Sequence, residues 1–558
     1  MKTKKTFFSF YLSACTLLLG GALMTACSSD DLDEGAKGVD MVKGMQIELA
    51  FADYGEDTES TMTRAAAATP AKDTVVLGNG LVAEISVERD AKAGSEAPAK
   101  PATRALSAGT YTMAAYQGGV FKGDVTGTVS GSVFTPTSSN PAIILTPGTY
   151  DFVCYNEFVS RNGNELTVAQ ADAGKALIGR AANQRVSGAR QKIRFTMNHV
   201  GARMRVKLTS YVSVHDSIKA KVADTDGDAP VTAHYDMSTG TYTYANGALT
   251  PGEYAFGESK EWARRGYFAA EWRENYTSLS DYQYFLPSTE GAKLKLTFSQ
   301  GTLYYKDVAG VTIPVNPDPA ITMKQNGSYT VNVKMLYDFY YLYSDGTTDR
   351  ISAAAGRTPV GVVVSRSQRL AAALKEAGNG NWCQSSYQLN LANSQQFPTP
   401  AQALNDMAGE DWTWDAAHSH DGQVKANESV AFPAFYKAAH YDAGTTLSGG
   451  LEQKRWFLPS AGQMKYLFTG LGKGDIDPVI AQTAFTNATH FPWKGDLANA
   501  AFVQLGGSSI YDSGGKAFFT STEVDYQTIV MVSTNPEYMR WTEIGKPSYV
   551  AILPFVNY

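Results

Sequence analysis

Cysteine and histidine are scarce in this chain. Four of its 558 residues are cysteine and seven are histidine. Cys154 and Cys383 lie far apart in the sequence, so no disulfide framework is predicted and stability must come from ordinary hydrophobic cores. The sequence also lacks a nucleophile paired with a base, a glycine-rich phosphate loop and acid pairs in a recognisable frame. We therefore expect neither an enzyme nor a bound cofactor.

Positive charge is not concentrated in any segment. The net charge is −6, from 48 Lys and Arg against 54 Asp and Glu, and the basic residues form no cluster. Because phosphate binding needs a basic patch, we do not expect nucleic acid as a partner. With 44% apolar residues, 18% charged residues and 51 glycines, the composition indicates a globular, turn-rich chain. Its length suffices for about three or four domains of roughly 150 residues each.

The amino terminus has the form of an export signal. Three lysines precede an apolar run from Thr6 to Ala26, and the small residue Ala26 stands directly before Cys27. This pattern resembles the lipobox of bacterial lipoproteins, so residues 1–26 are predicted to be a signal peptide. The resemblance implies that Cys27 carries acyl chains, which anchor stably when there are two or more of them. The acidic run after Cys27 resembles the signal that sends some lipoproteins to the outer face of the outer membrane.

Two alternatives to this assignment stay open. The apolar run of 21 residues could span a bilayer as an uncleaved helix. Cys15 also follows a lipobox-like sequence, but it leaves too short an apolar segment after the lysines. The charge pattern around Cys27 favours cleavage at that residue.

Residues 27–108 alternate strand-like islands with loose, low-complexity stretches. The islands are Met45–Phe51 and Leu81–Val87, and each is followed after a loose stretch by Thr-Arg-Ala, at Arg64 and at Arg104. Segments rich in Ala, Thr, Pro and Lys bury little and are open to proteases. Arg64 and Arg104 are therefore candidate cleavage sites, and the alternative is that both are simple loop cations. Of the two, Arg64 follows the more regularly alternating strand.

From residue 109 to 335 a glycine turn repeatedly leads into an aromatic strand. Examples are Gly109-Thr110-Tyr111, Gly148-Thr149-Tyr150 and Gly327-Ser328-Tyr329. Glycine supplies the turn, and Thr, Tyr and Val suit a pleated, half-buried surface. The pattern predicts two β-sandwich domains, 109–186 and 187–335, with a boundary near Ser187.

After about residue 336 the composition changes. Six of the eight tryptophans lie here: Trp382, Trp412, Trp414, Trp456, Trp493 and Trp541. Ser460 and Gln463 have the spacing of a capping box, and apolar residues follow at helical intervals. The segment from Leu370 to Ala377, closed by Gly378, also predicts a helix. Residues 336–558 are thus predicted to form a separate α+β domain, and the fold class as a whole is mainly β.

The first part of the chain resembles the fimbrillin family, the lipoprotein pilins of Gram-negative anaerobes. The resemblance covers residues 27–335. It rests on the lipobox, the early strand with Thr-Arg-Ala, Leu145–Val153, the strand pair around Met197-Asn198-His199, and Gln325–Val333. It implies that an arginine-specific or trypsin-like protease removes the lipidated amino-terminal strand. A strand from the next subunit then fills the groove, so the implied partners are other fimbrial subunits.

The last part, residues 336–558, resembles a domain of bacterial surface proteins related to C-type lectin-like folds. Trp456–Met464 carries the most specific piece, and Phe519–Glu523 follows in the expected order. The family usually has Trp or Tyr where Phe519-Thr520 stands here, which weakens any inherited binding site. The resemblance implies a region that presents an adhesive surface to a glycan or a host protein.

Three short motifs have both a functional and a plain interpretation. Trp412-Thr413-Trp414 would place both indoles on one face of an extended segment as a sugar platform, or else belong to the core. His418, with His420 and Asp421, could hold a metal or form a polar loop. Asp224–Asp228 is similar to a calcium loop but lacks its glycine and glutamate positions, which favours an Asp/Gly turn. Trp412, Trp414 and His418 are the candidate ligand-binding residues, and no metal site is predicted.

Together these features predict a surface lipoprotein of the fimbrillin family, a fimbrial tip or accessory subunit that mediates adhesion. The long C-terminal domain leaves no terminal strand to donate, which favours a tip position. The expected location is the outer membrane before cleavage and the fimbrium after it. The alternative is a lipoprotein that never polymerises and binds glycan or another surface ligand. An enzyme acting on a surface polysaccharide is a more distant alternative.

Overall fold

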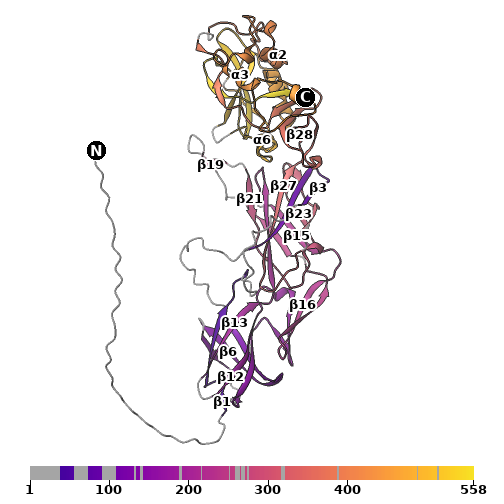
Figure 1. Ribbon diagram of the computed structural model, residues 1–558, viewed down its shortest axis with the longest axis vertical. Helices are drawn as coiled ribbons and strands as arrows, with labels where there is room; N and C mark the ends of the chain where they lie inside the picture. The colour runs from indigo at the N-terminus through magenta and orange to yellow at the C-terminus, as the bar shows by residue number, and fades with distance from the viewer. Residues whose placement is uncertain are drawn as a thin grey trace, which may run out of the picture.

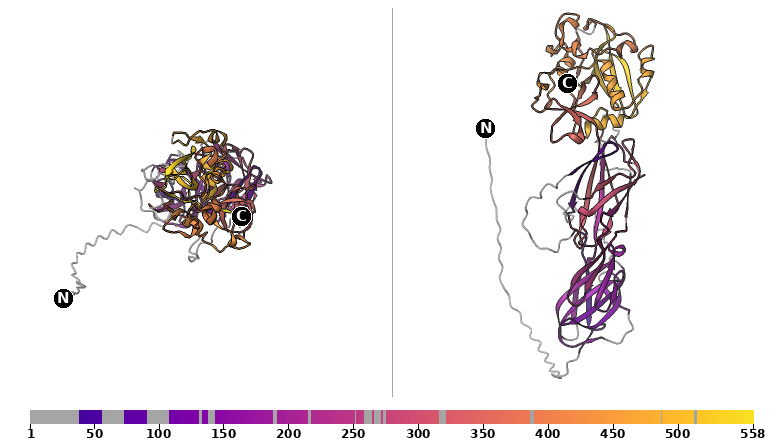
Figure 2. Two further views of the ribbon diagram at one scale, coloured as in Figure 1. Left: turned by 90° about the horizontal axis from the view of Figure 1, so that it is seen from above. Right: turned by 90° about the vertical axis from the view of Figure 1, so that its right-hand side faces the viewer.

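The computed structural model describes residues 38–55, 73–90, 108–130, 133–137, 143–187, 191–214, 217–250, 252–257, 264–265, 271–272, 275–315, 321–385, 389–486, 488–511 and 515–558. Cys27, Arg64 and Arg104 lie outside these residues. The described part is elongated, with a barrel at one end, a sandwich in the middle and the C-terminal region at the other end (Figures 1 and 2). The chain is mainly β, as its sequence predicts.

The first unit is a closed barrel. Its strands follow the order β12 (Leu177–Val186), β13 (Gln191–His199), β2 (Met45–Phe51), β7 (Val133–Pro136), β6 (Val120–Ser130), β5 (Gly109–Gln117) and β9 (Gly148–Asn156). A short pair, β1 (Val39–Asp40) with β8 (Ile144–Leu145), lies beside it. Alternate residues such as Ile193, Phe195 and Met197 point inward and are buried. This alternation is the period-two signal of a half-buried strand.

The second unit is a β-sandwich. One sheet has the order β21 (Tyr276–Leu279), β14 (Ala202–Ser210), β27 (Ser328–Tyr337), β4 (Leu81–Arg89) and β3 (Asp73–Leu77), with β22 (Gln283–Phe285) also paired to β14. The other has β18 (Gly252–Phe256), β15 (Ile218–Asp224), β23 (Leu294–Gln300) and β26 (Thr312–Pro314). Val206 and Val331 from the first sheet share one core with Ala220 and Leu296 from the second. Two further pairs are β19 (Arg264–Arg265) with β20 (Glu271–Trp272), and β24 (Thr302–Leu303) with β25 (Lys306–Asp307).

A small sheet joins the barrel to the sandwich. Its order is β10 (Ser160–Asn162), β11 (Glu165–Ala169), β16 (Ala229–Asp236) and β17 (Thr241–Gly247). The first two strands come from the part of the chain that forms the barrel, and the last two from the part that forms the sandwich. Leu166 and Tyr235 are buried in the core between them. The chain itself passes from the barrel to the sandwich at Val200–Gly201, between β13 and β14, and the predicted boundary near Ser187 stays a prediction.

The C-terminal region combines two sheets with short helices. The first sheet has the order β29 (Thr348–Arg350), β28 (Tyr340–Tyr343), β30 (Pro359–Ser365), β31 (Leu370–Ala373), β39 (Phe555–Asn557) and β33 (Trp456–Phe457). The second sheet has the order β32 (Asn379–Asn381), β38 (Tyr549–Ala551), β35 (Lys516–Glu523), β36 (Thr528–Thr534), β37 (Tyr538–Gly545) and β34 (Phe491–Pro492). The helices are α1 (Pro400–Ala403), α2 (Gly409–Trp414), α3 (Pro433–Ala439), α4 (Ala461–Tyr466), α5 (Asp477–Ile480) and α6 (Gly495–Val503). A π-helical turn, Leu467–Leu471, continues α4. No helix among the described residues is long and apolar enough to cross a membrane.

Two local predictions for this region have opposite outcomes. The capping box at Ser460 is confirmed: its hydroxyl accepts from the Gln463 backbone, and the Gln463 side chain accepts from the Ser460 backbone. The helix expected from Leu370 is wrong, because Leu370–Ala373 form strand β31. All four residues of β31 are buried between β30 and β39. Pairing on both sides outweighs the helix propensity of leucine and alanine.

Candidate functional site: strand β2 and its groove

Strand β2 is held by its neighbours unequally. It runs parallel to β13 along its whole length, from Met45 opposite Gln191 to Phe51 opposite Met197. On its other side the described residues give a single register pair with β7, Glu48 opposite Val133. Its hydrogen bonding therefore depends mainly on β13, and its loss would leave the barrel open between β13 and β7.

The inner face of β2 is a row of apolar side chains. Met45, Ile47 and Leu49 are 9%, 4% and 3% exposed and belong to the barrel core. Phe51 ends the row with an edge-on contact to Tyr111, at 6.1 Å between ring centroids. Each such side chain contributes roughly 2 kcal/mol when fully buried. The groove that β2 fills is thus a series of apolar pockets two residues apart.

The outer face of β2 carries one charged residue that fixes its register. The Glu48 carboxylate pairs with Lys192, and it accepts a 2.9 Å hydrogen bond from Arg194 Nε, both on β13. These hydrogen bonds lower the pKa of Glu48 below its usual value. Because the three residues lie on the solvent face, this charge match selects the register of β2 more than it stabilises the barrel.

The chain after β2 is pinned at the junction with the sandwich. The Tyr54 ring stacks on His199, at 3.8 Å between centroids, and the Arg203 guanidinium lies 4.6 Å from the same ring. The Asn326 side-chain amide donates to the Asp53 carbonyl at 2.7 Å. Burial raises the pKa of the Tyr54 hydroxyl. Described structure stops one residue later, at Gly55, before the segment that holds Arg64.

The chain before β2 is anchored by Val39 and Met41, which are buried in the barrel core. A tight turn leads into the strand, with the Gly44 amide donating to the Asp40 carbonyl at 2.7 Å. A cavity of about 350 Å³ opens there, lined by Lys43, Gly44, Met45 and Gln46 together with Gln191 and Lys192 of β13. The N-terminal end of the β2 groove is thus open to solvent.

The second strand-like island, β4, lies in a different environment. It pairs with β27 along its whole length, from Leu81 opposite Tyr337 to Arg89 opposite Tyr329. It also pairs with β3 on its other side, from Leu81 to Ile85. Leu81, Val82 and Ile85 are fully buried. Strand β4 is therefore built into the sandwich on both sides, unlike β2 in the barrel.

The two indoles proposed as a sugar platform do not form one. Residues 412–414 belong to helix α2, whereas the platform needs an extended segment. The Trp412 side chain is 3% exposed, and its Nε1 donates to the Asp406 carboxylate at 2.9 Å. Trp414 is half-buried, and its Nε1 donates to the Trp456 carbonyl at 2.8 Å. The core interpretation is correct for Trp412, and the exposed platform is wrong.

His418 packs against this core. Its ring lies edge-on to Trp412 at 5.3 Å, and its Nδ1 lies 3.0 Å from the Asp415 carboxylate. Asp421 accepts hydrogen bonds from the Ser419 hydroxyl and the Gln423 backbone. These contacts fit the polar-loop interpretation of His418–Asp421. Within the described part of the chain, no three His, Cys, Asp or Glu side chains are arranged to hold a metal ion.

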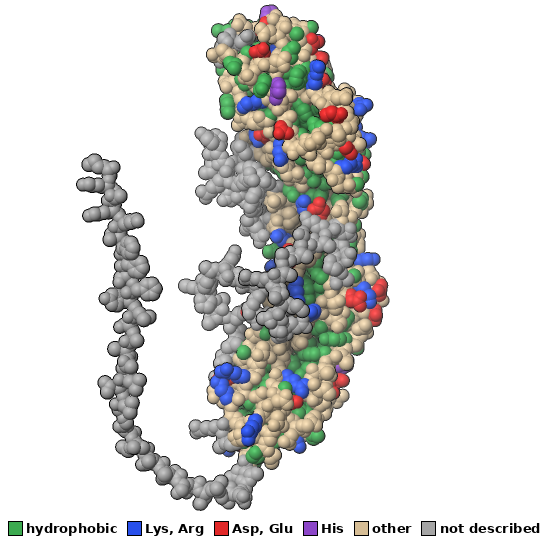
Figure 3. Space-filling model, in the orientation of Figure 1, with side chains coloured by type: hydrophobic (Ala, Val, Ile, Leu, Met, Phe, Trp, Pro, Cys, Tyr) green, Lys and Arg blue, Asp and Glu red, His purple; other side chains and the backbone are tan. Residues whose placement is uncertain are grey.

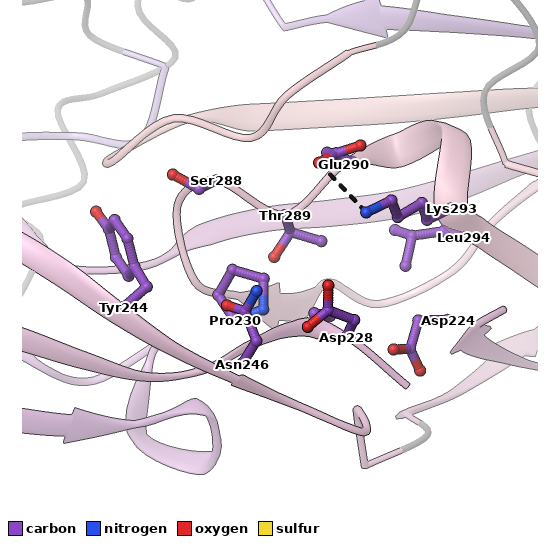
Figure 4. Close-up of a pocket in the computed structure, with 11 residues that line it drawn as sticks. Asp224, Asp228, Pro230, Tyr244, Asn246, Ser288, Thr289, Glu290, Lys293 and Leu294 are labelled. Atoms are coloured by element: carbon purple, nitrogen blue, oxygen red, sulfur yellow. Dashed lines mark ion pairs between the residues drawn. The ribbon is translucent and has the colours of Figure 1, made fainter. Parts of the chain in front are cut away.

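The aspartate-rich motif forms a turn beside a pocket. Residues 225–228 connect β15 to β16, and Gly227 has φ +68°. The pocket beside it is lined by Asp224 and Asp228 and, across from them, by Glu290 and Lys293, whose ion pair spans 3.5 Å (Figure 4). Lys293 pairs with Glu290, and the acidic side chains of this described part of the chain are not arranged as a group of three that could hold a metal ion. The Asp/Gly-turn interpretation is therefore the better one.

The segment around Phe519, on which the resemblance to lectin-like domains partly rests, is buried. Phe519, Thr520 and Glu523 have no exposed surface. The Glu523 carboxylate pairs with the fully buried Lys546 and accepts from the backbone amides of Ala392 and Asn393 at 2.9 and 2.8 Å. This motif therefore ties strand β35 to the segment 390–393, and its side chains hold the fold together.

Sequence reasoning did not identify the partner of β2 or the residues that fix it. Glu48, Tyr54 and Asn326 reach partners far away in the chain, so no local pattern marks them. The charge alternation Lys192-x-Arg194 on the outer face of a predicted strand is the one available signal. It indicates an acidic partner on a neighbouring strand.

Comparison with known proteins gives structural matches only. No protein-family model matches the chain, and no curated protein matches it significantly. A fimbrial protein from Bacteroides ovatus is 12% identical with a TM-score of 0.24, and the match covers 94% of this chain and 100% of that chain. A fimbrial protein from Bacteroides vulgatus is 11% identical with a TM-score of 0.25, covering 40% and 88%.

A third match is a candidate cell adhesion protein from Bacteroides uniformis. It is 14% identical with a TM-score of 0.28, and the match covers 42% of this chain and 93% of that chain. With TM-scores of 0.28 or lower, these three likenesses establish neither a common fold nor a common function.

Proposed function

We propose that this chain is a fimbrial tip or accessory subunit of the bacterial surface, which joins the fimbrium when a strand from the next subunit replaces its own strand β2. One observation carries the proposal: β2 fills a groove between β13 and β7 while depending on β13 for nearly all of its described pairing. Removal of this strand would expose the β13 edge and a row of apolar pockets. An incoming strand gains main-chain hydrogen bonds from the edge and side-chain burial from the pockets.

Cleavage at Arg64 suits this mechanism better than cleavage at Arg104. A cut after residue 64 would release β1 and β2 and leave the sandwich sheets complete. A cut after residue 104 would also release β3 and β4 and open the sandwich beside β27. The second cut would thus destroy the fully buried contacts of Leu81, Val82 and Ile85. We therefore assign processing to Arg64.

The remaining parts of the proposal concern the two ends of the chain. Residues 1–26 act as a signal peptide and Cys27 as the lipidation site, which holds the unprocessed subunit on the outer membrane. The C-terminal region, from about residue 336, serves adhesion and not catalysis. Its lectin-like resemblance supports the adhesive role, although Trp412 is removed from the candidate ligand residues because it is buried.

The decisive experiment compares processing and polymer formation in cells. Arg64→Ala is expected to keep the chain lipidated and monomeric on the surface, whereas Arg104→Ala is expected to polymerise like the wild type. Amino-terminal sequencing of the polymer should begin at Ala65. Polymers formed by a double variant lacking both arginines would refute strand exchange. A wild-type chain that stays uncut, lipidated and monomeric on the surface would instead favour the lipoprotein that never polymerises.

A further inference from the structure

A cavity lies at the neck between the sandwich and the C-terminal region. Strand β27 ends at Tyr337, and Asp338-Phe339 lead directly into β28. The cavity measures about 280 Å³, and its polar lining comes from Asp338, Tyr340, Arg350, Arg366 and Lys473. Its walls belong to the ends of β27, β28, β29 and β30 and to the π-helical turn. Three cations therefore meet one carboxylate in a space at the small end of the range for ligand sites.

The carboxylate of Asp338 already has hydrogen-bond partners within the protein. Its side chain is 6% exposed, and its oxygens accept from the Ser352 amide and the Ser352 hydroxyl, both at 3.0 Å. Arg350 Nη1 donates to the same carboxylate at 3.3 Å. Asp338 thus balances Arg350 at most, and the described residues provide no ion pair for Arg366 or Lys473, which both line the cavity and are exposed.

Arg366 is positioned by a ring and by no acid. Its guanidinium carbon lies 4.3 Å from the centre of the Tyr340 ring, and the Arg350 guanidinium carbon lies 4.8 Å from the same centre. Among the described residues, no ion pair or hydrogen bond involves the Arg366 guanidinium. Its donor fork is therefore available to a ligand, while the stacking on Tyr340 limits the directions in which it points.

Lys473 brings a second available charge to the cavity. The residue has φ +56°, and its Nζ donates to the Gly470 carbonyl at 2.7 Å. Burial lowers the pKa of Lys473, and the nearby positive charge of Lys306 on β25 lowers it further. Cations from the sandwich and from the C-terminal region thus repel each other across the neck. A negative group in the cavity beside Lys473 would offset this repulsion.

We propose that the neck cavity binds a small oxyanion: a carboxylate, sulfate or phosphate group, either free or carried on a saccharide. Arg366 supplies a fork that matches two oxygens of such a group, and Lys473, which follows the π-helical turn, supplies a point charge to the same cavity. Tyr340 presents the apolar surface beside them. The site does not depend on strand exchange, because none of its residues lies in or beside the barrel.

The test is isothermal titration of the purified full chain at low ionic strength with inorganic phosphate, glucuronate and glucose. Phosphate, glucuronate or both are expected to bind, and glucose is not, because it carries no charge. Arg366→Ala should weaken the binding about tenfold or more, as expected from the loss of a charge-assisted hydrogen bond. Lys473→Ala should weaken it similarly, and added salt should weaken binding to the wild type.

Arg369→Ala is the matched control. Arg369 lies on the same β30–β31 turn, but its Nε donates to the Tyr558 carbonyl at 2.7 Å, outside the cavity. This variant should bind like the wild type. Acetate, titrated in the same way, carries the carboxylate of glucuronate without the sugar ring. Stronger binding of glucuronate than of acetate identifies a saccharide as the carrier, and equal binding of the two identifies a free anion. The proposal fails if neither phosphate nor glucuronate binds, if glucose binds as well as glucuronate, or if Arg369→Ala weakens binding as much as Arg366→Ala.

Discussion

Two side chains of the C-terminal core show how burial decides a residue's role. Trp412 fills the core between Phe397 and His418, with both rings edge-on to it. Lys425, 1% exposed, lies beneath the same helix and donates to the Trp412 carbonyl at 3.4 Å. Its Nζ lies 5.8 and 5.7 Å from the ring centres of Phe432 and Phe435. Trp412 and Lys425 thus share one apolar site. Burial of the Trp412 ring stabilises the fold, whereas burial of the charged Lys425 amine lowers the free energy of unfolding.

The first prediction concerns the two tryptophans. Trp412→Ala should lower the free energy of unfolding by about 3–5 kcal/mol, the usual cost of emptying a large buried side chain. Trp414→Ala should cost clearly less, because its ring is only half-buried. Urea unfolding followed by circular dichroism measures both. Equal and small effects would mean that Trp412 is exposed after all.

The second prediction concerns the pH dependence set by Lys425. Burial lowers the pKa of Lys425 to about 8, from 10.5. Above pH 10.5 the amine is neutral in both the folded and the unfolded chain, and its burial carries no charge penalty. As the pH falls towards 8 the unfolded chain takes up the proton first, so the folded state loses stability over this range. Lys425→Met should be more stable than the wild type at pH 7, by about 3 kcal/mol at most. Its advantage should shrink at pH 9.5, and an advantage that does not change with pH would contradict the prediction.

At the scale of elements, local signals in the sequence succeeded and long-range pairings were not visible. The Ser460 capping box and the β2 alternation depend on residues a few positions apart, so the sequence predicts both correctly. Strand β31 contains leucine and alanine, which favour a helix, but it is buried between β30 and β39. The neck cavity likewise joins residues from β27 to the π-helical turn, which no spacing rule connects. Strand β31 and the neck cavity both depend on contacts between residues far apart in the chain, which is why the sequence did not predict them.

The third prediction tests how β2 fills its groove. Ile47→Ala should speed amide hydrogen exchange along β13, because it removes a buried side chain that holds β2 against the barrel core. Gln46→Ala is the control, since Gln46 is exposed on the opposite face of the same strand. Mass spectrometry of peptic fragments covering residues 191–199 measures the exchange. If the two variants behave alike, β2 does not depend on its apolar row.

At the scale of the whole molecule, three units stand end to end and are joined by continuous cores (Figure 1). Lys and Arg side chains alternate with Asp and Glu on the surface of the C-terminal region and the neck (Figure 3). The barrel and sandwich are joined by the chain at Val200–Gly201 and also by the β11–β16 ladder, where Val168 pairs with Ala233. A backbone crossing and a paired ladder together resist bending better than a single linker does.

The fourth prediction concerns this rigidity. Ala233→Pro introduces a residue without an N–H in the middle of β16, so it should break the β11–β16 ladder and loosen the barrel against the sandwich. Small-angle X-ray scattering should show a broader distribution of interatomic distances than the wild type gives. Thr243→Ala, on the outer strand β17 of the same sheet, should leave the distribution unchanged. An unchanged curve for Ala233→Pro would show that the ladder does not set the shape.

The parallel pairing of β2 with β13 has a mechanical consequence. Strand β13 continues through Val200–Gly201 into β14, so part of a pull along the long axis passes from the sandwich into the barrel through this backbone, beside the part that the β11–β16 ladder carries. The force then reaches β2 sideways, along the ladder from Met45 to Phe51. Pairs loaded along the strand direction share the force and must break together, whereas pairs opened from one end break one by one. A strand seated in this groove therefore resists being dragged out along its own axis under tension.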